Sequence, residues 1–326
     1  MIMGMIMIKM VSICIPSLNR SVYLLKTLKS IYEQESHNLC FEVCISNNAS
    51  TDDYSIIEEY VEKIKESHGN VIYISHEKQI PIDEHHHYVT NMARGDYIYF
   101  LGDDDCFYPD AFNKISKLLE ENDLDLAIFN GAKIDENNKF IGRVLSLPDK
   151  KYEDLESAFL DLKDKSPFGA ILVKKEYLSN NYFKLLYGTS HAYCCFWLNM
   201  MNHKEWFFTI IIPDFRCVQL RRLKKNYSRV DVFYHEIAFY IETFYANVNS
   251  DKAKEIIRIF REEHNKKIYS IPFMAYMLYH GTKLSQLKNS SPGKPFFFFK
   301  KLISRILAIN PIYDFAHSFY FKIIKK

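Results

Sequence analysis

The sequence predicts an α/β protein whose central sheet is mainly parallel and carries helices on both faces, followed by a helical C-terminal region. Two observations support this fold class. Strand-like and helix-like segments alternate through the first 130 residues, and residues 232–280 read as helices with few turn signals. The 326 residues are 48% hydrophobic and 25% charged, which excludes intrinsic disorder, collagen and coiled coil. We therefore expect an α/β domain over residues 1–225 and a helical region over 226–326.

The first two strands are predicted from short β-rich runs. Residues 10–15 form the first run, which Pro16 ends, and residues 41–45 form the second. Apolar residues recur at helical spacing over 24–32, so a helix should connect these strands.

The next helix and strand follow the same alternation. Residues 50–53 combine a hydroxyl cap with acidic side chains, which favours a helix start there. Ile57, Val61 and Ile64 give this helix an apolar face, and residues 71–74 form a third strand.

The fourth predicted strand, residues 97–101, runs directly into an acidic turn at Asp103–Asp105. A helix is expected before it, near residues 87–93. Pro109 opens a helix that continues to Glu120, and residues 124–129 form a fifth strand. Beyond residue 130 the pattern loosens.

The later segments are predicted from weaker signals. Residues 170–173 read as a strand, 192–202 as an apolar helix, 210–213 as a strand end and 232–280 as helices.

Cysteine usage and the N-terminus indicate a cytoplasmic protein. The seven cysteines are odd in number and contain no CxxC pair, which argues against disulfides and zinc knuckles. Residues 1–8 are apolar but have no basic flank or cleavage site, so we interpret them as a leader into the first strand. No stretch reaches the length needed to span a bilayer.

Three polar clusters follow strands that should end at one edge of the sheet: Pro16–Asn19, Asn47–Ser50 and Asp103–Asp105. Ligands of parallel sheets bind at this edge. Consecutive carboxylates need a compensating cation, and Mg²⁺ or Mn²⁺ shared with phosphates fits oxygen ligands. The alternative is a solvated acidic turn that caps the following helix.

Residues 13–20, 43–52 and 93–105 resemble, in order and spacing, the family-2 glycosyltransferases of the GT-A fold. The Leu-Gly-Asp-Asp-Asp form of the third segment resembles the abequosyltransferase-like branch of bacterial surface polysaccharide synthesis. The resemblance covers about residues 8–130 and continues more weakly to about residue 200.

The resemblance implies a nucleotide-sugar donor, a divalent metal (Mn²⁺ or Mg²⁺) and inversion at the anomeric carbon. It places Asp103 and Asp105 as the metal-binding pair. The residues that it assigns to donor binding are Pro16, Ser17, Asn19, Arg20, Asn47, Asn48, His87, Asp103 and Asp104.

The family commonly has acidic residues where this chain has Asn47 and Asn48. An Asn can accept a hydrogen bond from uracil or thymine, or donate one to cytosine, so UDP, CDP and dTDP donors all stay open. The alternative is that both residues simply form a turn.

His85, His86 and His87 cannot all face one metal ion, because they are consecutive. His87 falls where the family often has an Arg or Asn near the donor, and His86 lies beside it. Either could bond the diphosphate or the base, and a solvated loop cluster is the alternative.

An inverting transfer needs a general base, and the family usually supplies an Asp from a Glu-Asp motif. The chain has no clear copy of this motif. His191, before the predicted helix 192–202, is one candidate, and its alternative is a helix-start His bonded to backbone. Asp214, after the strand end 210–213, is the other candidate.

Two basic segments point to anionic partners. The run from Arg216 to Arg229 could neutralise the leaving diphosphate or contact a lipid-linked acceptor, or be a solvated helix face. Residues 296–326 predict a basic amphipathic helix, suited to an anionic membrane on the inner face of the plasma membrane. The alternative is packing on protein. Nucleic acid is not expected as a partner, and no oligomeric state is predicted.

The sequence thus predicts an inverting glycosyltransferase that moves a sugar from a nucleoside-diphosphate donor to a hydroxyl of a saccharide or lipid-linked saccharide. The missing Glu-Asp motif leaves open a non-catalytic subunit that binds nucleotide-sugar or glycan. A nucleotidyltransferase would need a glycine-rich, lysine-containing loop after the first strand, which residues 17–20 are not.

Overall fold

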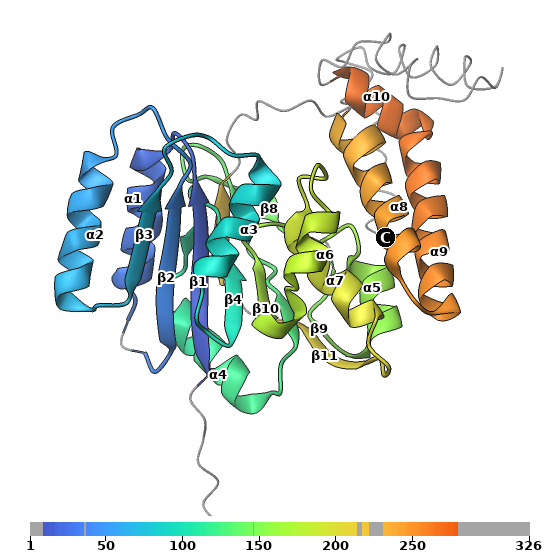
Figure 1. Ribbon diagram of the computed structural model, residues 1–326, viewed down its shortest axis with the longest axis horizontal. Coiled ribbons are helices and arrows are strands. Elements are labelled where there is room, and N and C mark those ends of the chain that lie inside the picture. Colours follow the sequence, from blue (N-terminus) through green and yellow to red (C-terminus); the bar gives the residue numbers. More distant parts are fainter. Residues whose placement is uncertain (1–8, 36, 146, 214–216, 222–230, 280–326) are drawn as a thin grey trace, which may run out of the picture. The chain divides into compact units, whose positions relative to one another are not determined.

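The computed structural model describes residues 9–279 except 36, 146, 214–216 and 222–230 (Figure 1). The chain divides into two compact units. The first comprises Met1–Tyr187 and His191–Lys224, and the second comprises Gly188–Ser190 and Lys225–Lys326. The functional division at residue 225 that the sequence predicts stays a prediction.

An eight-stranded sheet forms the centre of the first unit, in the order β3-β2-β1-β4-β10-β6-β11-β9. Its strands are β1 (Met10–Ser17), β2 (Cys40–Asn47), β3 (Val71–Ser75), β4 (Tyr97–Phe100), β6 (Leu126–Ile128), β9 (Lys150–Asp154), β10 (Ile171–Lys174) and β11 (Phe207–Ile212). The first four are mutually parallel, which confirms the predicted βαβ alternation. β10 is antiparallel to β4 and β6, so the sheet is mixed in its second half.

A second sheet of four short strands has the order β5-β12-β7-β8. Its members are β5 (Cys106–Phe107), β7 (Ala132–Ile134), β8 (Phe140–Arg143) and β12 (Val218–Arg221). None of these strands was predicted, because runs of two to four residues carry no periodicity. β5 follows the acidic turn directly, so this sheet lies beside the candidate site.

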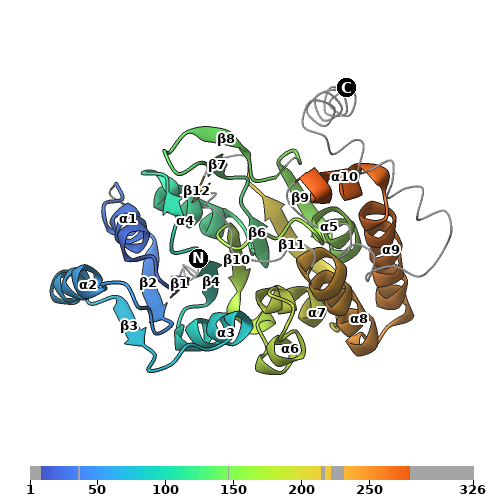
Figure 2. The same cartoon turned by 90° about the horizontal axis from the view of Figure 1, so that it is seen from above.

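Helices cover both faces of the central sheet, as predicted. They are α1 (Ser21–Tyr32), α2 (Ser55–Ser67), α3 (Ile82–Met92), α4 (Ala111–Glu121), α5 (Leu155–Leu162), α6 (Asn180–Leu185) and α7 (Cys195–Met201). Figure 2 shows α1 and α4 on one side of the parallel strands and α3 on the other. The core between them is apolar, with Ile13, Leu28 and Val43 fully buried.

Two helix starts differ from the prediction. The helix expected from residues 50–53 begins at Ser55, where the backbone N–H donates to Asp53 Oδ1 at 2.9 Å. The helix expected near residue 87 begins at Ile82, directly after Pro81. Proline fixes a φ suited to a helix start, and Asp83 and Glu84 complement the helix dipole in the first turn.

The second unit contains the predicted C-terminal helices. A π-helical turn at Asp231–Glu236 leads into α8 (Ile237–Asn247), followed by α9 (Asp251–Ile268) and α10 (Ile271–Tyr279). Ser250 caps α9 by accepting a hydrogen bond from the Ala253 N–H at 3.1 Å. No helix within the described ranges is long and apolar enough to cross a membrane. The predicted amphipathic helix over 296–326 lies outside the described residues.

Candidate active site

The carboxyl ends of three parallel strands carry the polar segments that the sequence singles out. β1 lies between β2 and β4, and its register pairs Ser17 with Asn47. The Asn48 N–H donates to the Ser17 carbonyl at 2.9 Å, and the Leu101 N–H donates to the Cys14 carbonyl at 3.1 Å. The sheet therefore brings the three segments to one edge.

The loop after β1 is fastened to the loop after β2. The Asn19 N–H donates to Ser50 Oγ at 2.8 Å, and the Thr51 N–H donates to Asn19 Oδ1 at 2.7 Å. The Ser21 N–H, at the start of α1, donates to Asp52 Oδ2 at 3.0 Å. Asp52 therefore caps α1, although its position in the sequence suggests the start of the helix that follows it.

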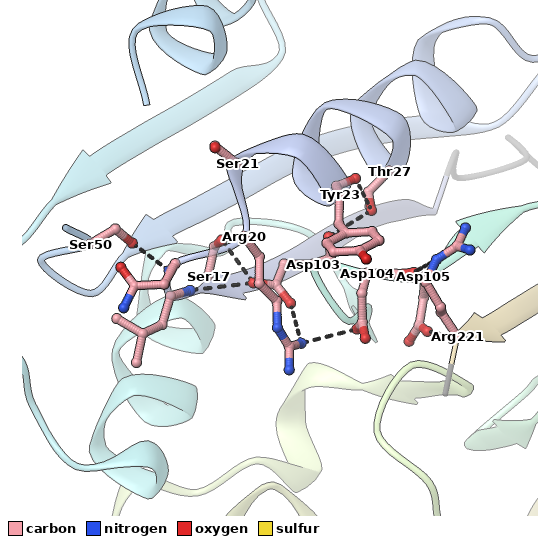
Figure 3. A network of polar contacts seen from close by, with 12 residues as sticks. Ser17, Arg20, Ser21, Tyr23, Thr27, Ser50, Asp103, Asp104, Asp105 and Arg221 are labelled. Carbon is pink, nitrogen blue, oxygen red and sulfur yellow. Dashed lines mark hydrogen bonds and ion pairs between the residues drawn. The ribbon is translucent and has the colours of Figure 1, made fainter. Parts of the chain in front are cut away.

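Asp103 is buried, and three donors hold its carboxylate (Figure 3). Arg20 Nη1 lies 2.8 Å from Oδ1, while Ser17 Oγ and the Leu18 N–H lie 2.9 and 3.3 Å from Oδ2. Burial is the main cause that raises the pKa of Asp103 to about 6. The Arg20 cation opposes this rise, and the charge of Asp104 adds to it. Arg20 also lies 3.2 Å from Asp104 Oδ1, so one cation serves two carboxylates.

Asp105 lies in a tight backbone cradle. Its Oδ1 accepts a hydrogen bond from the Arg221 N–H at 2.9 Å. A Cβ at Gly169 would lie 2.2 Å from Asp105 Oδ2, and one at Gly102 would lie 2.6 Å from it. Neither position can carry a side chain without displacing the carboxylate, and the φ of Gly169, +96°, also favours glycine.

Arg221, on β12, connects the acidic turn to the second sheet. Its Nε donates to the Asp104 carbonyl at 3.2 Å, and its Nη1 donates to Asn138 Oδ1 at 2.7 Å in the turn between β7 and β8. Figure 3 shows Arg221 beside the acidic residues. The sequence marked this residue only as part of a basic run, because its burial depends on strand pairing that the sequence does not reveal.

Tyr54 is a second residue that sequence reasoning missed. Its buried hydroxyl lies 2.6 Å from Ser17 Oγ and accepts a hydrogen bond from the Arg20 N–H at 3.3 Å. Since Ser17 Oγ in turn donates to Asp103, Tyr54 stabilises the acidic turn indirectly, through Ser17. No local pattern in the sequence indicates this role.

The amides of Asn47 and Asn48 are held by the protein. Asn48 Nδ2 donates to the Ile80 carbonyl at 2.9 Å, and Asn48 Oδ1 accepts from the Ile80 N–H at 2.8 Å. Asn47 Nδ2 donates to the Tyr73 hydroxyl at 3.1 Å, and its Oδ1 accepts from the Ser50 N–H at 3.1 Å. These contacts match the alternative interpretation, in which both residues form a turn. Contact of Asn47 or Asn48 with the nucleotide base stays a prediction.

His87 has both ring nitrogens engaged. Its Nε2 lies 2.7 Å from Asn180 Oδ1 and its Nδ1 lies 2.6 Å from the Tyr187 hydroxyl, while the ring stacks on Phe183 at 4.6 Å. The amide oxygen can only accept, so Nε2 donates, and we assign the Tyr187 hydroxyl as the donor to Nδ1. His87 therefore joins α3 to α6. Contact between His87 and the nucleotide-sugar donor stays a prediction.

His85 and His86 are also buried on α3, so the alternative of a solvated loop cluster is wrong. Burial, the main cause, lowers the pKa of His85 to about 4 and that of His86 to about 3. His85 Nε2 lies 2.9 Å from the Ser46 carbonyl. His86 stacks on Phe168 at 4.6 Å, and its buried Nδ1 has no hydrogen-bond partner among the residues that the structure describes. Both rings are therefore neutral at pH 7.

The two candidate bases differ in what the structure says of them. His191 is partly exposed and directly precedes the short 3-10 turn Ala192–Cys194, and its ring lies 6.1 Å from that of Tyr193. The Ala192 N–H donates to Asp83 Oδ1 at 3.0 Å, so this turn is fastened to α3. Asp214 lies outside the described residues, as does most of the basic run around Arg221.

The acidic turn offers two carboxylates, which are the ligand type that Mg²⁺ or Mn²⁺ takes. Asp103 and Asp105 are both buried, and the glycine cradle leaves Asp105 Oδ2 bordered by backbone. Among the residues described, no group of three or more His, Cys, Asp or Glu side chains could hold a metal ion. Such a cation would therefore be held by one or two carboxylates together with phosphate oxygens and water, as Mg²⁺ commonly is.

The sheet order and the acidic turn at its carboxyl edge define a GT-A-type fold. The structure of S. aureus TarS 1–349 in complex with UDP-GlcNAc matches with a TM-score of 0.59 at 14% identity, over 95% of this chain and 92% of that one. The sequence profile described as glycosyl transferase family 2 matches residues 12–201, more than half of the chain. The protein belongs to this family, which confirms the resemblance found in the sequence.

Curated relatives match shorter regions. The abequosyltransferase RfbV of Salmonella typhimurium is 34% identical over 34% of this chain and 33% of its own length. A GalNAc(5)-diNAcBac-PP-undecaprenol beta-1,3-glucosyltransferase of Campylobacter jejuni is 26% identical over 71% of this chain and 74% of its own length. An uncharacterized glycosyltransferase of Rickettsia conorii is 32% identical over 42% of this chain and 21% of its own length. The matched region therefore spans a third or less of the Salmonella and Rickettsia relatives and about three quarters of the Campylobacter relative.

Proposed function

We propose that this protein is an inverting glycosyltransferase of bacterial surface polysaccharide synthesis. It would transfer one sugar from a nucleoside diphosphate to a hydroxyl of a saccharide or lipid-linked saccharide. The observation that carries the proposal is the meeting of three distant segments, in which Ser17 and Arg20 bind Asp103 at the carboxyl edge of the sheet. The names of the Salmonella and Campylobacter relatives support the substrate class.

The donor would lie against the loop Pro16–Arg20 and the acidic turn. The Arg20 side chain is 40% exposed, while those of Asp103 and Asp104 are 7% and 13% exposed. Its guanidinium can therefore contact a diphosphate while it still neutralises the two acids. The nucleotide base stays open among UDP, CDP and dTDP.

Asp105 and Asp103 would hold a divalent cation together with the donor diphosphate. When bound, Mg²⁺ or Mn²⁺ supplies positive charge that stabilises the leaving nucleoside diphosphate. The chain's part is to hold these carboxylates in place, which it does through the Arg221 N–H on Asp105 and three donors on Asp103.

His191 would act as the general base. The acceptor oxygen forms a bond to the anomeric carbon as the bond from that carbon to the phosphate oxygen breaks. The electron pair leaves with the nucleoside diphosphate, and the acceptor proton passes to the His191 ring. Direct displacement inverts the anomeric configuration.

Thermal shift with UDP, GDP, CDP and dTDP, each with and without Mn²⁺, tests the proposal. Binding of one nucleotide at a hundredfold excess over Kd would add ~2.7 kcal/mol to the free energy of unfolding. A metal-dependent shift with one pyrimidine diphosphate, with turnover of the matching sugar nucleotide, is the expected result. Binding without turnover under any acceptor would favour the non-catalytic subunit.

A lipid-linked acceptor would require the protein to work at a membrane surface. We propose a peripheral position on the inner face of the plasma membrane, through residues 296–326. Flotation with anionic liposomes should then recover the full chain and not a chain cut at Ser291. Equal recovery of both would exclude the tail as the anchor.

A further inference from the structure

One face of α3 is fastened to a segment a hundred residues later in the chain. Asp83, His86 and His87 are spaced three and four residues apart, so their side chains share one face of the helix. Each contacts the segment from Tyr187 to Tyr193, which contains His191.

The fastening holds both ends of this segment. At one end, the Tyr187 hydroxyl lies 2.6 Å from His87 Nδ1, and His87 Nε2 lies 2.7 Å from Asn180 Oδ1. At the other end, the Ala192 N–H donates to Asp83 Oδ1 at 3.0 Å. Asp83 is only 2% exposed, so the carboxylate that makes this bond is shielded from water. A charged acceptor in such a place forms a strong hydrogen bond.

The same face also reaches the acidic turn. His86 stacks on Phe168 at 4.6 Å and meets Tyr193 edge-on at 5.6 Å. Phe168 contacts Phe100, the last residue of β4 before the acidic turn, and its neighbour Gly169 adjoins Asp105. A continuous set of packed rings therefore connects the segment with His191 to the strand that carries the carboxylates.

We propose that Asp83 is a positioning residue for sugar transfer, which fixes the segment that carries His191 by binding the Ala192 N–H, with His87 fixing the other end through Tyr187. This inference rests on the proposed function. Asp83 acts through the backbone beside His191 and does not touch the donor. Its loss should lower the rate of transfer and leave nucleotide binding intact, because Ser17, Arg20 and Asp103 do not depend on α3 for their contacts.

The test compares Asp83→Ala with Asp83→Asn in the full chain. The amide oxygen of Asn can still accept from the Ala192 N–H, whereas Ala cannot. In Asp83→Ala we expect hydrogen exchange of a peptide covering 187–193 to be at least tenfold faster. The Kd, with Mn²⁺, for whichever of UDP, GDP, CDP and dTDP the wild type binds should stay within twofold of wild type. The kcat with the sugar nucleotide that the wild type turns over should fall at least tenfold at unchanged donor KM. Asp83→Asn should restore kcat to within threefold.

Tyr187→Phe tests the other end with little risk to folding, since it removes one hydroxyl. It should accelerate exchange in the same peptide and lower kcat at least threefold. Asp125→Ala is the matched control, because Asp125 is also buried and accepts a backbone N–H, from Thr209 at 2.7 Å. Asp125 directly precedes β6, and Lys174, the last residue of β10, pairs with it. Its loss should lower the melting temperature and leave kcat unchanged.

The outcomes separate the two proposals. A wild-type chain that turns over donor while Asp83→Ala does so equally well would overturn the positioning role and leave the proposed function standing. Unchanged exchange at 187–193 in Asp83→Ala, or a parallel loss of kcat and of binding of that nucleoside diphosphate, would also overturn it. A wild-type chain that binds none of the four nucleotides would instead end the proposed function, and the positioning role with it.

Discussion

Arg20 and Asp103, which are 83 residues apart in the chain, form an ion pair of 2.8 Å that joins the end of β1 to the turn after β4. The pair is asymmetric, because the Arg20 side chain is 40% exposed and that of Asp103 is 7% exposed. A buried carboxylate without a cation is unfavourable, and burial already raises the pKa of Asp103 to about 6. Arg20 therefore stabilises the acidic turn in the absence of any ligand.

Arg20→Ala should destabilise the protein by about 1 kcal/mol, a value reduced from that of a fully buried pair because Arg20 is partly in water. Arg20→Lys keeps the charge and should lose less. Urea denaturation of both variants measures this. Arg258→Ala, which breaks exposed pairs with Glu255 and Glu262 on α9, is the control and should shift the midpoint less than Arg20→Ala does. Equal midpoints for Arg20→Ala and wild type would contradict the role given to the pair.

Asp105→Asn should abolish transfer and keep the fold. The amide oxygen can still accept from the Arg221 N–H, which lies 2.9 Å from Oδ1, so the free energy of unfolding should change by less than about 1 kcal/mol. Loss of the charge should lower kcat by about 10² or more, since charge stabilisation of the leaving group is a large term. Kinetics with and without Mn²⁺, beside a urea curve, check both parts. Full activity of the wild type in metal-free buffer would end the metal role.

The first half of the fold could be predicted because each strand and helix there carries its own signal. Residues 10–15 and 41–45 are β-rich and mostly buried, and the helix between them has a clear apolar face. The second sheet could not be predicted. β5 has two residues and β7 has three, and their pairing with β12 joins segments about ninety residues or more apart, which no local pattern encodes.

The candidate site divides along the same line. Asp103 and Asp105 could be predicted, because they directly follow a buried strand at the binding edge of a parallel sheet. Tyr54 and Arg221 could not, since their roles depend on contacts with Ser17 and Asp105 that form only when distant strands pair. The alternative of a solvated cluster for the histidines of α3 is wrong for a related reason: the helix begins at Ile82, five residues earlier than expected, and its buried face includes them.

His86→Phe should reduce the loss of stability at acid pH. An unfolded His binds a proton near pH 6.5, while burial lowers the pKa of folded His86 to about 3, so the unfolded chain gains protons as pH falls below 6.5. The contribution of neutral His86 to the free energy of unfolding is thus fully present above pH 6.5 and is lost as the pH falls towards 3. Between pH 7.5 and 5, urea denaturation should show a loss about 2 kcal/mol smaller in His86→Phe than in wild type.

The neutral-pH stability of two variants separates titration from packing at this position. His86→Phe keeps the stack on Phe168 and removes the unpartnered Nδ1, so its stability at pH 7.5 should equal or exceed that of wild type. His86→Gln should show the same flatter acid response but lower stability throughout, because it buries an amide without a ring to stack. A wild-type acid slope in both variants would show that His86 does not contribute.

Gly169→Ala should impair activity by displacing the Asp105 carboxylate. Gly69→Ala is the matched control. The φ of Gly169 is +96° and a Cβ there would lie 2.2 Å from Asp105 Oδ2, so alanine brings both backbone strain and displacement of a carboxylate. Gly69 has a φ of +69°, but a Cβ there would meet nothing closer than the Lys65 carbonyl at 3.9 Å. Gly69→Ala should cost about 1 kcal/mol in urea denaturation and keep kcat, because only backbone strain is added. Gly169→Ala should lower stability further and reduce, at least tenfold by calorimetry, the Mn²⁺-dependent binding of the nucleoside diphosphate that the wild type binds. Equal binding of that nucleotide by the two variants would show that the position of the Asp105 carboxylate does not limit donor binding.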